Sequence, residues 1–327
     1  MIGEVLALLT ALMWSASVIF FSYAGRNISA VNLNLIRLVL ASIFLGVTLS
    51  VMAYSPFPKG ANLEAWLWLG GSGLLGLALG DYFMFMSYQI IPPRITQLIM
   101  TLGPPFAALF GYLILGETLT LYCALGMVFT LSGISLSILS KNSGDNQGSS
   151  EELNDGQKKK AFKVKQDLPI KGLLCALVAA FCQGVGLVLS KQGMVAYEAN
   201  LLTDASFTPP NQFYISLAST QARNICAMVC FILLVTFNGG WKSLFASFSE
   251  RKHLGFLSLG AVVGPFVGVS FSLMALQFTS AAVTSTILAL IPVILILPDR
   301  FIFHKKVTFA EVVGACISVF GVSMFFW

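Results

Sequence analysis

Apolar residues run through this chain in stretches of about 20, the length that an α-helix needs to cross the hydrocarbon core of a bilayer. Short polar stretches separate these runs. The pattern predicts an all-α membrane protein with ten transmembrane helices. The predicted spans are 3–23, 32–54, 65–88, 93–115, 119–140, 169–190, 212–237, 254–277, 280–303 and 307–327.

Composition agrees with this interpretation. Hydrophobic residues make up 57% of the 327 residues and charged residues only 10%, with a mean hydropathy of +0.84, which is not a soluble composition. The net charge of +5 does not indicate nucleic-acid binding, because the bases lie at the ends of apolar runs, where they contact lipid headgroups and set topology. The six cysteines all fall inside apolar runs without metal-type spacing, so we expect no metal site, no disulfide framework and no cofactor.

The sequence repeats itself. Residues 94–139, moved forward by 188 positions, lie on residues 282–327 without a gap. Shared Pro, Gly and Thr at one constant offset indicate a duplication, because each of these residues constrains the backbone or the polarity at a particular depth. The matched pairs include Thr96 with Thr284, Pro104 with Pro292, Gly126 with Gly314, Gly133 with Gly321, Gly76 with Gly264, Gly80 with Gly268, and Gln89 with Gln277.

This duplication predicts three parts. Residues 1–140 form a first repeat of five spans, residues 141–168 form a polar linker, and residues 169–327 form a second repeat of five spans. Because each repeat has an odd number of spans, the second enters the membrane from the opposite side, and the two repeats are inverted, as in many transporters.

The positive charges predict the orientation. Most of the 19 Lys and Arg residues lie in loops that follow odd-numbered spans. By the positive-inside rule these loops are cytoplasmic and both termini face outward. We expect a multi-pass protein of the plasma (cell inner) membrane.

Asp81 is the sharpest functional candidate. It lies well inside the third span, where an ionised carboxylate is costly unless it is paired or hydrated. Such a residue suits a proton-coupling or cation-binding group, and the alternative is a structural ion pair that never contacts substrate. Arg223, near the middle of the seventh span, is its expected counterpart and would attract a carboxylate or phosphate. Arg37 is its repeat mate and is expected to be structural.

Further polar and aromatic residues either line a solute pathway or connect helices. The symmetric positions at the third-to-fourth and eighth-to-ninth turns could do either. Two aromatic residues in spans could stack on a substrate or simply pack. These pathway candidates are Gln89, Thr96, Gln97, Gln183, Gln277, Thr284, Trp14 and Tyr82.

Four prolines interrupt the hydrogen-bond ladder of equivalent spans, the fourth and the ninth, and are candidate hinges or static kinks: Pro104, Pro105, Pro292 and Pro298. Glu117 ends the fourth span in the sequence LGET, and we expect it to cap the helix that follows.

The run LGPPFAALFGYLILGETLTLYCALGMVFTLSGISL resembles the end of an EamA repeat of the drug/metabolite transporter superfamily, with a mid-span Pro, then LGE, then a Gly-spaced final helix. The opening ALMWSASVIFF and the segment around Arg37 are similar to the start of such a repeat. The resemblance implies ten helices in two inverted five-helix repeats, a central cavity, and export of small metabolites or drugs. The second copy departs from it, with His304-Lys305-Lys306 in place of LGE. Many members also keep both termini cytoplasmic, against the charge bias here.

The sequence thus predicts a secondary transporter of small polar or amphipathic metabolites, amino-acid-like solutes or drugs, working by alternating access with protons as the candidate coupling ion. The alternative is a membrane-embedded enzyme that acts on a lipid-linked substrate, but no HExxH and no cluster of His and carboxylates indicates catalytic residues. The expected partners are a small solute, protons and membrane lipids, with no nucleic acid. Since both repeats lie in one chain, a monomer or a homodimer suffices.

Overall fold

The computed structural model describes residues 1–24, 29–91, 93–148, 169–203, 207–247, 251–296, 298 and 308–326, which form helices and short turns without any strand. Within these residues nine helices are long and apolar enough to cross a membrane. A tenth apolar segment, Ala281–Ile294, is shorter. The predicted all-helical membrane fold is therefore confirmed, with a helix count close to the expected ten.

The first repeat contains α1 (Ile2–Ala24), α2 (Ala30–Ala53), α3 (Leu63–Ser72), the π-helix η2 (Gly73–Gly80), α4 (Asp81–Ile90), α5 (Pro93–Met100), α6 (Gly103–Phe110), the π-helix η3 (Gly111–Leu115) and α7 (Leu121–Gly148). Helix α7 therefore continues to Gly148, past residue 141, where the polar linker was predicted to begin. The second contains α8 (Ile170–Thr203), α9 (Tyr214–Phe237), α10 (Trp241–Ser247), α11 (Arg251–Ala261), the π-helix η4 (Val262–Gly268), α12 (Val269–Phe278), α13 (Ala281–Leu288), α14 (Ile291–Ile294), α16 (Phe309–Ser323) and the short 3₁₀ turn η5 (Met324–Phe326).

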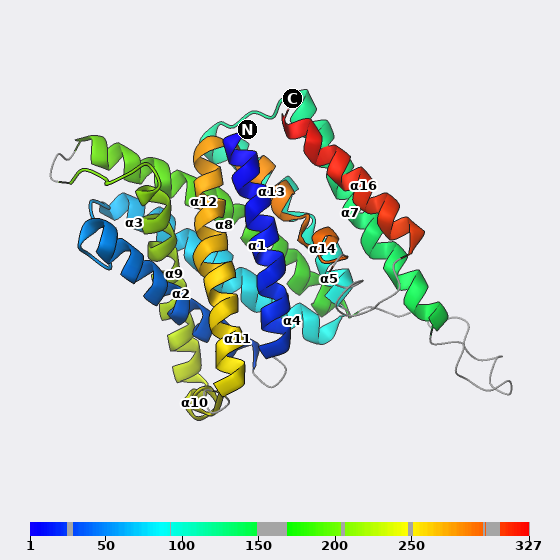
Figure 1. Cartoon of the computed structure of the whole chain (residues 1–327), viewed down its shortest axis with the longest axis horizontal. Coiled ribbons are helices and arrows are strands. Elements are labelled where there is room, and N and C mark those ends of the chain that lie inside the picture. Colours follow the sequence, from blue (N-terminus) through cyan, green and yellow to red (C-terminus); the bar gives the residue numbers. More distant parts are fainter. Residues whose placement is uncertain are drawn as a thin grey trace.

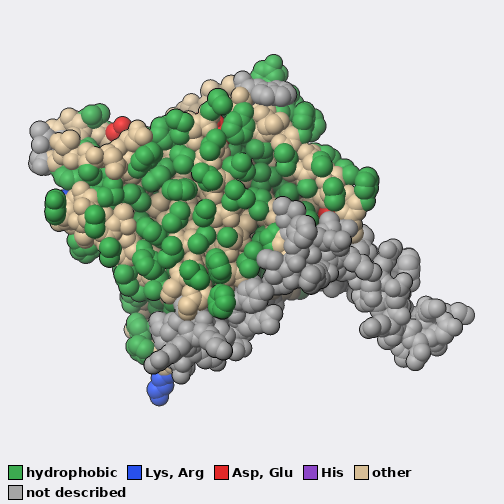
Figure 2. All heavy atoms as spheres, viewed as in Figure 1, with side chains coloured by type: hydrophobic (Ala, Val, Ile, Leu, Met, Phe, Trp, Pro, Cys, Tyr) green, Lys and Arg blue, Asp and Glu red, His purple; other side chains and the backbone are tan. Residues whose placement is uncertain are grey.

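The chain ends share one face of the bundle, at the top of Figure 1, which we call the terminal face. The opposite face, where α7 ends and α8 begins, is the linker face. Shared placement of the two ends is what an even number of spans requires. The outside of the bundle is apolar, and Figure 2 shows hydrophobic side chains over most of one side with very few charges. A surface of this kind suits lipid rather than water.

Helix α8 is longer than predicted. The sequence indicated a span at 169–190, whereas α8 continues to Thr203 over 34 residues. That length is about 51 Å, against about 30 Å for the hydrocarbon core. Its last turns are held by the loop that precedes α3, because Asn200 Nδ2 donates to the Gly60 carbonyl at 2.8 Å. Hydropathy falls after residue 190, and hydropathy alone cannot show that a helix continues beyond the membrane.

Helices α7 and α16 form an antiparallel pair at one edge of the bundle (Figure 1). Their contacts are reciprocal about Thr130 and Ser318, which are 188 positions apart in the sequence. The Thr130 hydroxyl donates to the Ser318 carbonyl at 3.4 Å, and the Ser318 hydroxyl donates to the Thr130 carbonyl at 3.3 Å. Equivalent residues contact each other in this way only across a local two-fold axis, which is the contact expected of an inverted repeat.

Glycines make this crossing close. A Cβ atom on Gly133 would lie 2.5 Å from the Gly314 carbonyl oxygen, and one on Gly314 would lie 2.6 Å from the Gly133 carbonyl oxygen. Gly126 and Gly321 approach each other in the same reciprocal manner, at 2.7 Å both ways. The shared glycines of the two copies therefore serve close helix packing in the membrane.

The remaining helices of the two repeats interlock. Helix α8 packs on α3, η2 and α4 of the first repeat, and α1 packs in the corresponding way on α11, η4 and α12 of the second. Figure 1 shows α1 beside α11 and α12. The first helix of each repeat is thus held by the third span of the other: α8 packs on η2, and α1 packs on η4.

Backbone irregularities also repeat at the same offset. The π-helices η2 and η4 occupy equivalent positions in the third and eighth spans. The fourth and ninth spans are both broken by a two-residue turn, which ends at Leu102 in the fourth span and at Leu290 in the ninth. Both features depart from regular i→i+4 hydrogen bonding, and π-helical segments are frequent at functional sites.

The close crossing yields a stability prediction. Gly133→Ala should destabilise the protein by about 1–3 kcal/mol, because the new methyl group meets backbone atoms of α16 that cannot move aside. Gly71→Ala is the matched control, since nothing lies within 4 Å of its Cβ position and alanine favours a helix by about 0.5–1 kcal/mol. Reversible unfolding in mixed micelles measures both. Equal stability of the two variants would contradict the packing described for α7 and α16.

Candidate functional site

A buried ion pair lies inside the bundle between Arg37 of α2 and Asp81, the first residue of α4. Asp81 is 6% exposed and Arg37 is 5% exposed. The expectation that Arg223 is the counterpart of Asp81 is therefore wrong, because Arg37 takes that place. That expectation used only the depth of each residue along its predicted span. Depth in the membrane does not tell which side of a helix a residue occupies.

The first helices of both repeats hold this pair. From α8, Gln183 Nε2 donates to Asp81 Oδ1 at 3.4 Å. From α1, the ring of Trp14 lies 5.9 Å from the Arg37 guanidinium carbon, within the range of a cation–π interaction. Trp14 and Gln183 occupy equivalent places in the two copies. These contacts join four side chains in one polar cluster, which we call the central cluster: Trp14, Arg37, Asp81 and Gln183.

Glycines at the ends of the π-helices let these side chains approach. A Cβ atom on Gly80 would lie 3.1 Å from Gln183 Cγ, and a Cβ atom on Gly268 would lie 3.2 Å from Trp14 Nε1. Both distances are tighter than ordinary van der Waals contact. The absence of a side chain at these equivalent glycines of η2 and η4 therefore leaves space for the Gln183 side chain in one case and for the Trp14 indole in the other.

Arg223 lies beside the central cluster on α9 and is 4% exposed. A Cβ atom on Gly76 of η2 would lie 3.4 Å from its Nη2. Its Nε has no hydrogen-bond partner among the described residues. Next to it, Gln221 Nε2 donates to the carbonyls of Ser42 and Pro56 at 3.2 and 3.3 Å. Gln221 thus ties α9 to α2, whereas the guanidinium of Arg223 faces η2.

Other predicted pathway residues lie away from this cluster. Thr96 Oγ1 is 2.8 Å from the hydroxyl of Ser87, which in turn donates to the Gly172 carbonyl at 3.0 Å, so these groups connect α4, α5 and α8. Gln97 donates to the Tyr88 hydroxyl. The side chain of Gln89 lies outside the described part of the structure.

The second-copy counterparts lie elsewhere. Gln277 Nε2 donates to the Gln212 carbonyl at 3.5 Å, near the end of α12. Thr284 is fully buried in α13, and its hydroxyl has no hydrogen-bond partner among the described residues. Tyr82 is half-buried and lies edge-on to the ring of Phe83, with centroids 5.5 Å apart. Inversion separates the polar turn of one copy from that of the other, so sequence symmetry does not bring these residues together.

Three of the four predicted kink prolines mark breaks between helices. Pro104 and Pro105 lie in the first turn of α6, and Pro292 lies in the first turn of α14. Proline is well tolerated in a first turn, where its missing N–H has no intrahelical acceptor. The fourth and ninth spans are therefore broken before these prolines rather than bent at them. Pro298 is half-buried, but its neighbours on both sides lie outside the described residues.

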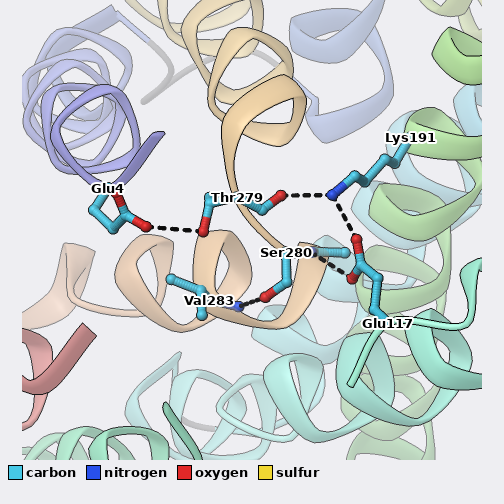
Figure 3. A network of polar contacts seen from close by, with 7 residues as sticks. Glu4, Glu117, Lys191, Thr279, Ser280 and Val283 are labelled. Atoms are coloured by element: carbon cyan, nitrogen blue, oxygen red, sulfur yellow. Dashed lines mark hydrogen bonds and ion pairs between the residues drawn. The ribbon is translucent and has the colours of Figure 1, made fainter. Parts of the chain in front are cut away.

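A second polar network lies near the terminal face and joins the two repeats (Figure 3). Lys191 of α8 forms a 2.5 Å ion pair with Glu117 and donates to the Thr279 carbonyl at 2.6 Å. The Thr279 hydroxyl donates to Glu4 Oε1 of α1 at 3.0 Å. We call Glu4, Glu117, Lys191 and Thr279 the terminal-face network.

Glu117 does cap a helix, but not the one expected. Its Oε2 accepts the backbone N–H of Ala281, the first residue of α13, at 3.0 Å. The start of α7 is capped by Thr120, whose hydroxyl accepts the N–H of Cys123 at 3.3 Å. The sequence placed Lys191 just after a span and gave no signal for this network, because the end of α8 was set too early.

The described cavity between α2 and α9 has a volume of about 520 Å³. Its lining includes Val47 and Val51, which are 59% and 76% exposed on the outside of the bundle. An apolar, outward-facing groove of this kind suits hydrocarbon rather than a polar solute, so the central cluster remains the better candidate for solute binding.

Comparison with known proteins agrees with the fold. A solved structure described only as "Crystal structure of protein" superimposes with a TM-score of 0.69 at 15% identity, covering 99% of this chain and 95% of the other. At that identity the likeness shows the fold alone. A search of curated proteins finds no match. The model of the EamA-like transporter family matches residues 1–139 and 212–327, most of the chain. The protein therefore belongs to the EamA-like transporter family and is a multi-pass membrane transporter of the drug/metabolite superfamily.

Proposed function

We propose that this protein is a secondary transporter that carries a small polar or amphipathic metabolite or drug through the bundle by alternating access around the central cluster. The main support for this proposal is the buried Arg37–Asp81 ion pair. It lies in the region where α8 packs on η2 and α1 packs on η4. Ionisable groups at such depth are expensive to keep, and in transporters they mark solute and ion pathways. Both repeats contribute to the cluster, so a single chain can form the whole site, as a monomer or within a homodimer.

Asp81 is the proposed coupling residue. Its carboxylate forms an ion pair with the Arg37 guanidinium and accepts a hydrogen bond from the Gln183 side-chain amide. These two contacts connect α4 to α2 and to α8. Protonation would remove the charge that holds Arg37 and would weaken both contacts at once. A proton bound there is thus linked to the packing of three helices from both repeats, which is what coupling requires.

The terminal-face network is the proposed gate on that side. It joins α1 and the Glu117 turn of the first repeat to α8 and the α12–α13 turn of the second. Rocking of one repeat against the other has to break these contacts before a solute can leave at that face. The broken fourth and ninth spans and the π-helices provide the irregular backbone at which such movement is easiest.

The charge distribution supports an orientation and a direction. The bases concentrate in loops on the linker face, which we place in the cytoplasm of a cell whose plasma membrane holds the protein. The terminal face is then external. In this arrangement the ion pairs of the terminal-face network close the outer end, and a solute from the cytoplasm is exported when they open.

Flux measurements test the proposal. Proteoliposomes with purified protein should take up members of a panel of labelled metabolites, amino acids included, at a rate that depends on an imposed proton gradient. Asp81→Asn keeps an oxygen that can accept from Arg37 but loses the titratable charge, so we expect gradient-driven flux to fall at least tenfold, an order-of-magnitude expectation for loss of a proton-transferring group.

The matched control is Glu64→Gln, which removes an exposed carboxylate near the start of α3 and should leave flux unchanged. Normal gradient-driven flux by a folded Asp81→Asn protein would remove Asp81 from the coupling mechanism. Wild-type protein that moves no solute of the panel under any gradient would count against a transporter of this kind.

The gate yields a second prediction. In a double-mutant cycle of Glu117→Gln and Lys191→Met, the coupling energy should be about 1–3 kcal/mol, because the pair is mostly shielded from water and each charge also serves a backbone group. Each single variant should also label faster at a cysteine placed behind the network. Additive effects on stability and unchanged labelling would show that the network does not close the terminal face.

A further inference from the structure

The two copies differ in charge at the position of Asp81. Arg37 and Arg223 are the corresponding basic residues of α2 and α9, 186 positions apart. Asp81 has no acidic equivalent, because position 269, at the 188-residue offset of the third and eighth spans, holds valine. The flanking glycines confirm the alignment, since Gly76 and Gly80 match Gly264 and Gly268. The second copy has therefore kept its guanidinium without the carboxylate that neutralises the first.

The structure shows the consequence. Val269 is buried, 5% exposed, and packs in the same apolar cluster as Ala222 of α9. Among the described residues no carboxylate pairs with Arg223, and its Nε has no hydrogen-bond partner, although its side chain is more than nine-tenths buried. The side-chain amide of Asn224, the next residue, is also buried with neither polar atom bonded.

A buried cation without a partner is costly. Removing one member of a buried pair strongly destabilises a protein, because the other charge remains uncompensated. Two guanidiniums and one carboxylate give this region a net charge of +1 within an apolar bundle. A bound anion would supply the missing charge and accept the free N–H groups, since a guanidinium matches carboxylate and phosphate geometry.

Small residues of η2 and α8 lie beside the guanidinium. It faces η2 at Gly76, where a Cβ atom would lie 3.4 Å from Nη2. The Gly186 Cα atom and the Cys182 carbonyl oxygen of α8 lie 3.6 and 4.0 Å from the same Cβ position. None of these neighbours has an acidic side chain, so they do not compensate the charge of Arg223.

We infer that Arg223 is an anion subsite of the solute pathway, and that it takes the carboxylate or phosphate of a small amphipathic anion whose remaining part lies toward the central cluster. The inference rests on the proposed transport function, and it adds that the solute is negatively charged. Arg37 is neutralised by Asp81 and is not available for this role.

Ligand binding, measured without flux, tests the subsite. Protein in phosphatidylcholine nanodiscs is titrated with benzoate, phenylacetate and phenyl phosphate, and with the uncharged benzamide and phenylacetamide, while thermal unfolding is followed. We expect the anions to stabilise the wild type and the amides to do so much less. Arg223→Gln should weaken anion binding at least about tenfold, the effect of losing one hydrogen-bonded charge pair. Arg223→Lys, which keeps the charge, should retain part of it.

Two further variants sharpen the test. Lys171→Gln removes an exposed base of α8 and should leave anion binding unchanged. Val269→Asp restores to the second copy the acid that the first copy has. It should raise the unfolding temperature of the unliganded protein and abolish the anion response, because an internal carboxylate would then occupy Arg223.

The outcomes are distinct. Equal stabilisation by anions and amides, no stabilisation by any anion, or an Arg223→Gln protein that still responds would overturn the subsite. Stabilisation that appears only when phosphatidylglycerol replaces part of the phosphatidylcholine, and is lost in Arg223→Gln, would assign the site to a lipid headgroup and overturn its place in the solute pathway. Anion binding that depends on Arg223 in a protein without flux would keep the subsite and count against transport instead.

Discussion

The Arg37–Asp81 ion pair is the interaction around which the middle of this bundle is built. Charges of both signs lie inside a molecule whose outer surface is apolar, and neither is tolerable there without the other. Their pairing requires α2 and α4 to meet at one depth, and it requires α1 and α8 to cover the pair with Trp14 and Gln183. The glycines and π-helices of the third and eighth spans make that approach sterically possible.

The two copies share their backbone features, but they differ in the polar residues of the central cluster. The backbone features are shared between the copies: the glycine crossing of α7 and α16, the π-helices, and the breaks before Pro104 and Pro292. Two residues of the central cluster are not shared. Gln183 stands in the place of Trp14, and Val269 in the place of Asp81, so a symmetric scaffold surrounds a strongly asymmetric site. The same asymmetry appears at the ends, where Glu117 of the first copy corresponds to Lys305 of the second.

Much of the fold could be predicted from the sequence, because membrane crossing leaves a strong signal in hydropathy and the repeat leaves one in its glycines and prolines. The all-helical membrane fold and the family resemblance are confirmed, and nine helices of the described residues are long enough to be spans. The continuation of α8 to Thr203 could not be seen, since its last turns are stabilised by the loop before α3 and not by lipid. The π-helices η2 and η4 are only eight and seven residues long, and over that length their hydrophobic periodicity does not differ from that of an α-helix. The sequence therefore could not predict them.

The site was harder to predict than the fold. Asp81 was identifiable as a buried charge, but its partner depends on which helix faces which, and this arrangement is set by interlocking of the two repeats. For the same reason the symmetric pair Thr96 and Thr284 does not converge. The bond from Glu117 to Ala281 joins residues 164 positions apart, and no local pattern in the sequence indicates it.

The central claim is that the charge of Asp81 works in transport and does not only stabilise the bundle. A charge-exchanged protein, with Arg37→Asp and Asp81→Arg combined, tests this most directly, because it keeps an ion pair between α2 and α4 while moving the carboxylate to another helix. The measurement is gradient-driven flux in proteoliposomes beside the unfolding temperature. We predict a folded protein whose stability is largely restored relative to either single variant and whose gradient-driven flux is lost. Full gradient-driven flux in the exchanged protein would show that the pair is structural and would contradict the mechanism.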